Sequence, residues 1–154
     1  MRRIRICGSE KEDGQSLIEF ALIAPIIILF LFGLVDFGLF LNQRIGEQHA
    51  VREGARYAAV SPDCTAIQQR TSERAGGIVD PGNVRVRYFD DDGPVTSAAA
   101  GDTVEVIAPL PYNFSLISRF GIPGGSGCVK VAAKARLEMA VPDAAGCGPE
   151  EVCP

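Results

Sequence analysis

The residues with the clearest chemical signal lie at the start of a long apolar run. Gly14 is followed five positions later by a carboxylate, Glu19, and Phe20 then opens an apolar segment that extends to Leu41. A charge on a membrane-spanning helix costs about 2.5 to 3.5 kcal/mol at the bilayer centre, so such groups are usually paired. A cut after Gly14 would create a free amine on Gln15, one helical turn from Glu19 or on a neighbouring subunit. The spacing therefore predicts either an interfacial carboxylate or an ion pair with such an amine.

A second carboxylate, Asp36, is the only charged residue between Phe20 and Leu41. At about 1.5 Å per residue, a helix of this length reaches roughly 33 Å, which is enough to cross a bilayer core of about 30 Å. The run is too long for the apolar core of a cleavable secretory signal. Asp36 then has two interpretations. It contacts a partner helix or an assembly subunit, or the span ends near Val35 and leaves Asp36 close to the far headgroups.

Five cysteines are divided by the apolar run: Cys7 precedes it, and Cys64, Cys128, Cys147 and Cys153 follow it. An even set on one side predicts two disulfides in an oxidising compartment. This favours a cytoplasmic amino terminus and an exported carboxyl-terminal domain. Of the three possible connectivities we favour Cys64 with Cys128 and Cys147 with Cys153, because the second pair closes a short tail loop.

The other polar groups predict no metal, cofactor or catalytic site. The one histidine, His49, is far from every cysteine and is interpreted as a solvated helix residue. Residues 90–92 are three aspartates before Gly93, and they lack the alternating oxygens and distant glutamate of an EF-hand loop, so a hairpin turn is expected. The glycine-rich residues 121–127 lack the context of a phosphate loop. We expect no enzyme, since no nucleophile, base and orienting group can be assembled. A net charge of −4 also argues against nucleic acid as a partner.

These groups must be positioned by a long helix and a small sheet. The apolar helix, kinked slightly at Pro25, is expected to continue over residues 42–60 as an extension rising into water. A stripe of mostly small apolar residues along this extension predicts close helix packing: Ile45, Val51, Ala55, Ala58 and Ala59.

Beyond this extension, a short helix is expected at residues 64–75, ended by two glycines. Alternating patterns predict strands at residues 84–89, 102–110 and 128–139, the second stopped by Pro109 and Pro111. Apolar anchors are expected over residues 112–120. Together these helices and strands predict an α+β fold, with a small antiparallel sheet covered on one face by a helix.

Three blocks together resemble a known family. They are the Gly-Gln-Ser-Leu-Ile-Glu-Phe-Ala-Leu-Ile-Ala-Pro entry from Gly14, the Gly-Leu-Val-Asp-Phe-Gly segment at 33–38, and the Arg-Glu-Gly-Ala-Arg-Tyr-Ala-Ala block at 52–59. In this order and spacing they resemble the TadE-like pseudopilins of the tight-adherence (Flp) pilus system. The entry by itself resembles the processing site of type IV prepilins.

The resemblance implies a minor pilin or pseudopilin without enzymatic activity. A membrane-embedded aspartyl prepilin peptidase would cut between Gly14 and Gln15 from the cytoplasmic side. Glu19 would then pair with the mature amino terminus of a neighbour and set the axial register. The implied partners are the peptidase, other pilins or pseudopilins and the pilus assembly platform, at the bacterial inner membrane.

The expected division of the chain is a leader (1–14), a membrane helix with its extension (15–60), an exported α+β domain (61–142) and a cysteine-containing tail (143–154). One alternative is an uncleaved single-pass membrane protein whose exported domain binds a ligand or surface. Another is a small secreted enzyme, for which only His49 offers a base.

Overall fold

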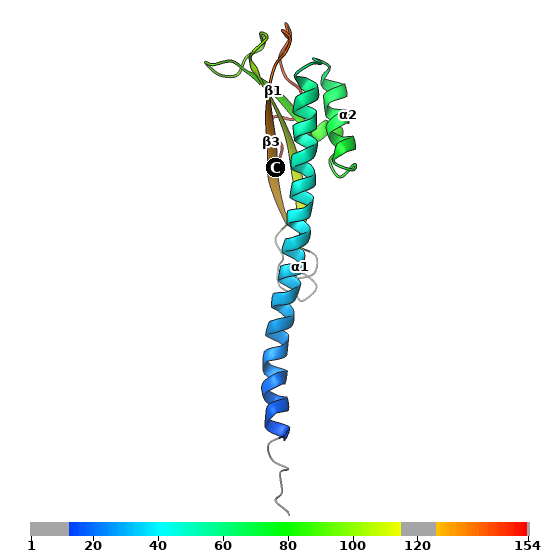
Figure 1. Ribbon diagram of the computed structural model, residues 1–154, viewed down its shortest axis with the longest axis vertical. Coiled ribbons are helices and arrows are strands. Elements are labelled where there is room, and N and C mark those ends of the chain that lie inside the picture. Colours follow the sequence, from blue (N-terminus) through cyan, green and yellow to red (C-terminus); the bar gives the residue numbers. More distant parts are fainter. Residues whose placement is uncertain (1–12, 115–125, 154) are drawn as a thin grey trace, which may run out of the picture.

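The apolar run forms the first part of a helix, α1 (Asp13–Ala58), which continues for 46 residues and includes Pro25 without a break. The computed structural model describes residues 13–114 and 126–153. Figure 1 shows α1 as the long axis of the molecule, with the sheet and the second helix gathered at its far end. The predicted helical extension beyond residue 41 is confirmed.

The first half of α1 exposes apolar side chains on every side. Leu17, Phe20 and Phe30 are each 68% exposed, and large apolar residues remain exposed as far as Leu41. A helix that is apolar all round is stable in lipid, where its backbone hydrogen bonds are satisfied internally. Within the described part of the chain, α1 is the helix long and apolar enough to cross a membrane.

The far half of α1 is part of the domain core. Val51, Ala55 and Ala58 have 1% exposure or less, so the predicted packing stripe is confirmed for them. Ile45 is an exception, because 56% of its surface is exposed. Six residues at about 100° each place Ile45 about 120° around the helix from Val51, and the side chain therefore points away from the core.

A short second helix, α2 (Cys64–Arg74), packs against this half of α1. Asp63 caps its start, since Oδ1 accepts hydrogen bonds from the backbone N–H groups of Thr65 at 3.0 Å and Ala66 at 3.3 Å. Gly76 ends it with φ +69°, a conformation that favours glycine. The predicted helix at residues 64–75 and its glycine stop are confirmed.

The two helices approach most closely at Gly54 of α1. A Cβ placed there would lie 2.1 Å from Oγ1 of Thr71, a buried hydroxyl that donates to the Ile67 carbonyl at 2.8 Å. The absence of a side chain at Gly54 is therefore what permits this contact between α1 and α2.

Gly54→Ala is expected to lower the free energy of unfolding of the domain by about 1 to 3 kcal/mol, because the added methyl overpacks the α1–α2 contact. Urea unfolding of the detergent-solubilised chain, followed by tyrosine fluorescence, measures the loss. Gly46→Ala is the matched control, since that position of the same helix has open space. Equal stability of the two variants would contradict the packing argument.

The sheet contains three antiparallel strands in the order β1-β2-β3. The strands are β1 (Arg85–Phe89), β2 (Thr103–Asn113) and β3 (Ser126–Arg136), and a 3-10 turn, η1 (Pro81–Asn83), leads into β1. The register aligns Arg87 with Glu105 and Glu105 with Lys134. All three predicted strands are present.

The second strand is longer than predicted, because β2 passes through Pro109 and Pro111 and ends at Asn113. The expectation that these prolines stop the strand was wrong. Two prolines two residues apart place their nitrogens on the same margin of a strand. The ladder to β3 continues past both, while β1 reaches only as far as Ile107. The missing N–H groups therefore lie on the margin that β1 leaves unpaired, where proline is tolerated.

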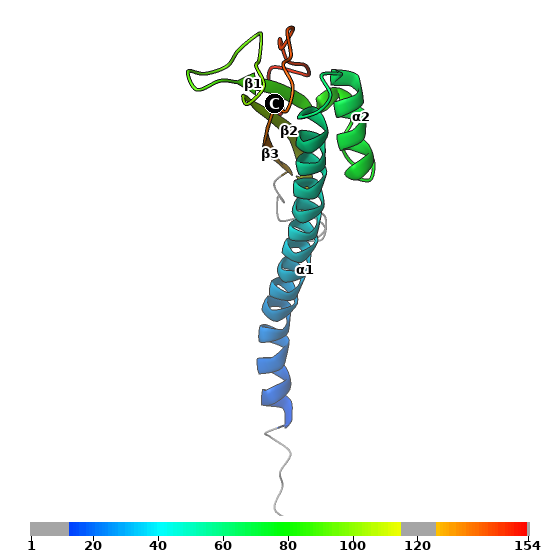
Figure 2. The same cartoon turned by 45° about the horizontal axis from the view of Figure 1, so that its top comes forward.

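One face of the sheet packs on α1, and α2 lies on the other side of α1, as both views show (Figure 1, Figure 2). The predicted helix cover is thus confirmed, and the covering helix is the far half of α1. The buried core joins residues from α1, α2, all three strands and the tail: Val51, Ala55, Ile67, Val86, Val104, Val106, Leu110, Val131 and Ala144.

The cysteines form two disulfides, as predicted, but the favoured connectivity was wrong. Cys64 pairs with Cys147, and Cys128 pairs with Cys153. The reason is the path of the tail, which turns back along β1. There the Val86 N–H donates to the Cys147 carbonyl at 2.8 Å, and the Cys147 N–H donates back at 3.1 Å. This pairing carries Cys147 to the start of α2, and it separates Cys147 from Cys153.

Candidate functional site

The amino-terminal end of α1 presents the predicted processing residues on an open helix turn. Gly14, Gln15, Glu19 and Phe20 are all exposed. The side-chain amide of Gln15 donates to Oε1 of Glu19 at 3.3 Å, so the two residues face each other across one turn. This end of α1 stands clear of the domain (Figure 1), so the turn is open to other molecules.

The fold itself does not explain why residue 14 is a glycine. A Cβ at Gly14 would meet nothing within 4 Å, and Gly14 lies inside a helix, where glycine is less favourable than alanine by about 1 kcal/mol. Gly38 and Gly46 have equally open surroundings. What distinguishes Gly14 is its position directly before Gln15 and five residues before Glu19.

The second predicted site residue, Asp36, lies where the domain reaches α1. It is only 1% exposed, although its neighbours Val35 and Phe37 are both 52% exposed. The hydroxyl of Tyr112, near the end of β2, donates to the Asp36 backbone carbonyl at 2.6 Å. Residues 15–35 give a helical span of about 32 Å, and every residue of it after Glu19 is uncharged. The interpretation in which the span ends near Val35 stays a prediction, as does the alternative contact with a partner helix or an assembly subunit.

Three aromatic rings hold the end of β2 against α1 at this level. The ring centroid of Tyr112 lies 4.9 Å from that of Phe40 and 4.8 Å from that of Phe114, both in edge-to-face geometry. Burial, and then the nearby Asp36 carboxylate, raise the pKa of the Tyr112 hydroxyl. That hydroxyl therefore stays protonated and can keep donating its hydrogen bond. Tyr112 and Phe114 are two of the predicted apolar anchors, and residues 115–120 lie outside the described part.

Sequence reasoning missed one buried carboxylate, that of Glu47, which lies about three turns beyond Asp36. Glu47 is 2% exposed, and neither of its carboxylate oxygens has a hydrogen-bond partner in the described structure. Burial raises its pKa to about 7. Glu47 also lines a cavity of about 170 Å³ with Arg74, Ala75 and Ile78. A signal was present in the sequence, because Glu47 lies four residues before Val51 and so falls on the apolar stripe.

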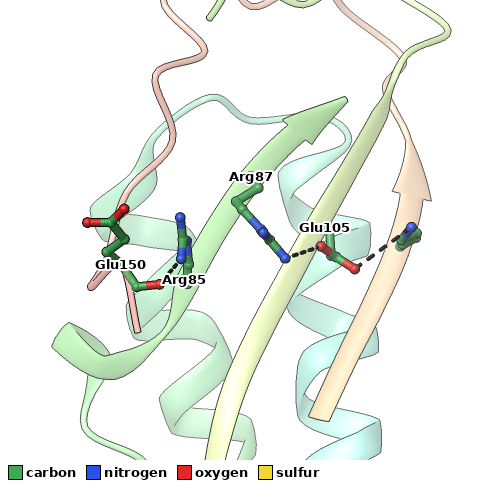
Figure 3. A network of polar contacts seen from close by, with 5 residues as sticks. Arg85, Arg87, Glu105 and Glu150 are labelled. Carbon is green, nitrogen blue, oxygen red and sulfur yellow. Dashed lines mark hydrogen bonds and ion pairs between the residues drawn. The ribbon is translucent and has the colours of Figure 1, made fainter. Parts of the chain in front are cut away.

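The outer face of the sheet is basic. Arg87 of β1 reaches Glu105 of β2 with an N–O distance of 2.8 Å (Figure 3). Lys134 of β3 reaches the same carboxylate at 3.8 Å. On the same view, the Arg85 side chain donates to the backbone carbonyl of Glu150. The register places Lys130 and Arg136 on this face as well, beside Pro109 and Thr103 of β2. Glu105 is the one acid of the three strands, so most of these cations have no neutralising partner on the sheet.

Two further predictions concern residues away from these sites. His49 is exposed on α1, as expected. Residues 90–93 form the predicted turn, in which Asp90 Oδ1 accepts hydrogen bonds from the N–H groups of Asp92 and Gly93, both at 2.8 Å. These contacts explain Asp90 as the residue whose side chain closes the turn.

The fold and the amino-terminal residues of α1, Gly14 to Phe20, together define a class of protein. In this class a long, apolar membrane-anchoring helix carries a small disulfide-linked α+β domain at its far end. Residues 14–56 match the family model described as TadE-like protein, so the chain contains a TadE-like domain over this range. Comparison with curated proteins and with solved structures gives no match. The resemblance to TadE-like proteins is thus confirmed over the range that holds both the α1 entry and Asp36.

Proposed function

We propose that this chain is a minor pilin-like subunit of a tight-adherence pilus system, cut by prepilin peptidase between Gly14 and Gln15 and then held in the inner membrane by α1. The observation that carries the proposal is the match of residues 14–56 to TadE-like proteins, which begins at the glycine before the proposed cut. The open helix end from Gly14 to Phe20 supports it, because this turn is accessible.

Glu19 is proposed to pair with the new amino terminus of a neighbouring subunit. In the uncut chain its carboxylate contacts the Gln15 side chain, at the same turn where the new amine would form. A carboxylate in the bilayer is costly without a partner, and attraction to an amine in a low-dielectric surrounding is strong and directional. The pair would fix how far one α1 slides along another.

The proposed orientation puts the amino terminus in the cytoplasm and the domain outside the inner membrane. Its support is the pair of disulfides, both within the part of the chain after the apolar run. Disulfides persist in oxidising compartments and are rare in the cytosol.

The test is the amino-terminal sequence and intact mass of the membrane-extracted chain, produced with and without a prepilin peptidase. We expect a start at Gln15 only with the peptidase, and the mass also reports whether Gln15 is free, methylated or cyclised. Gly14→Ala is expected to lower the cleaved fraction by about tenfold or more, because a small misplacement at a scissile bond is costly.

Gly38→Ala serves as the matched control for cleavage. It adds the same methyl to the same helix in open space, away from the proposed cut. A start near Met1 in both samples would instead support the uncleaved single-pass alternative, and the role proposed for Glu19 would be abandoned.

A further inference from the structure

β3 is an edge strand of the sheet, and its free margin, the edge that faces away from β2, is a surface that the proposed function does not use. Within the described residues, β2 is the only strand paired with β3, which is 11 residues long. The opposite margin of the sheet differs, because there the tail is bonded to β1 at Val86 and Cys147. An unpaired margin presents N–H and C=O groups that can pair with another chain.

The direction of the backbone groups of β3 follows from the two residues directly after it. The Leu137 N–H points toward β2 and donates to the Asp102 carbonyl at 2.7 Å, whereas the Glu138 N–H points the other way, to the Ala59 carbonyl of the α1 end at 2.9 Å. Directions alternate along a strand. The backbone groups of Ala132, Lys134 and Arg136 therefore point to the free margin.

This margin opens on a groove between β3 and α1. The groove has a volume of about 760 Å³, and its cations are Arg52 and Arg56 of α1 with Lys134 and Arg136 of β3. Its two acids are Glu53 and Glu138. Glu53 is already shared between two arginines of α2, at 3.7 Å and 3.8 Å. Two of these cations already have contacts, because Lys134 reaches Glu105 at 3.8 Å and Arg136 Nε donates to the Gly101 carbonyl at 2.7 Å. The groove is still basic, on a chain whose net charge is −4, and Arg52 and Arg56 are its exposed cations on α1.

The chain's own acidic stretches in the domain are held in place. Asp90 closes the turn that contains Asp91 and Asp92. Glu150 and Glu151 lie in a tail fixed by the contact with Arg85, by the buried Val152 and by the disulfide of Cys153. Neither stretch is free to extend as a strand, so this domain does not supply the charge complement of its own groove, and we assign it to a partner protein.

We propose that the free margin of β3 and the Arg52–Arg56 face of α1 form a docking groove for an extended acidic segment of a partner protein. The segment adds to the sheet beside β3 through backbone hydrogen bonds, and its carboxylates face Arg52 and Arg56 of α1. Backbone pairing supplies affinity, and the cations select for acidic sequences. This inference does not depend on whether residues 1–14 are removed.

The test uses the full chain in neutral detergent and a fluorescent peptide of about eight residues in which glutamate and valine alternate. We expect saturable binding that weakens as salt is added. Hydrogen exchange should slow at the amides of Ala132, Lys134 and Arg136. A peptide with lysine in place of glutamate should not bind. Equal binding of the two peptides would overturn the proposal.

Two kinds of variant test separately how much the groove cations and the backbone pairing contribute to peptide affinity. Arg52→Glu with Arg56→Glu reverses two exposed cations that line the groove and is expected to weaken binding by about tenfold or more. Arg44→Glu is the control, since Arg44 is an exposed cation of α1 outside the groove. Ala132→Pro removes one outward N–H while leaving the ladder to β2, and a similar loss is expected.

Two outcomes would contradict the assignment. Unchanged peptide affinity in both the charge-reversal and the Ala132→Pro proteins would place the binding elsewhere. Cross-linked dimers of the chain that disappear in the charge-reversal protein would identify a second copy, not an acidic partner, as the occupant.

Discussion

Replacing Cys64 and Cys147 together by serine is expected to lower the free energy of unfolding of the domain by about 4 to 5 kcal/mol. The reason is the length of chain that this disulfide closes: its cysteines are 83 residues apart, and the loop contains α2, β1, β2 and β3. The bond also anchors the tail to the start of α2. Urea unfolding of the detergent-solubilised chain, followed by the fluorescence of Tyr57, Tyr88 and Tyr112, measures the effect.

The second disulfide provides the comparison. Cys128 and Cys153 are 25 residues apart, so their replacement by serine should lower the same free energy by about 3 to 4 kcal/mol. The test compares the two decreases in unfolding free energy, and we expect the larger decrease for the Cys64 and Cys147 pair. A larger loss for the Cys128 and Cys153 pair would mean that local packing outweighs the chain-entropy effect in this domain.

Glu47→Gln is expected to remove a pH dependence of stability between about pH 4.5 and pH 7. Burial raises the pKa of Glu47 from 4.5 to about 7 in the folded chain, so the folded state holds a proton that the unfolded state releases. The favourable contribution of protonated Glu47 is complete below about pH 4.5. It is lost as the pH rises through about 7, and the free energy of unfolding falls across this window by about 1 to 3 kcal/mol.

The measured quantity is the difference in unfolding free energy between the native chain and the Glu47→Gln variant, determined at several pH values. Any fixed cost of burying an amide cancels in this comparison. Glu138→Gln is the matched control, because its carboxylate is exposed. A native-minus-variant difference for Glu47 that stays flat across the window would show that the carboxylate has a partner in solution.

The sequence by itself determined every element that depends on local pattern. The all-apolar run specifies a membrane-length helix, because periodicity and length are read directly from the residues. The paired glycines predicted the end of α2, and near-strict alternation predicted β1. The α1 entry from Gly14 to Phe20 was also visible at this level, since its order and spacing are contiguous in the chain.

Only the tertiary structure decided which distant residues meet. Pro109 and Pro111 were expected to stop β2, and pairing on one margin alone lets the strand pass through them. The disulfide partners depend on the tail turning back along β1, a path that cysteine spacing does not encode. Glu47 is buried where α1 meets the end of α2 and the loop that follows it. Pairing, burial and desolvation arise from contacts between segments far apart in sequence, and no local pattern specifies those contacts.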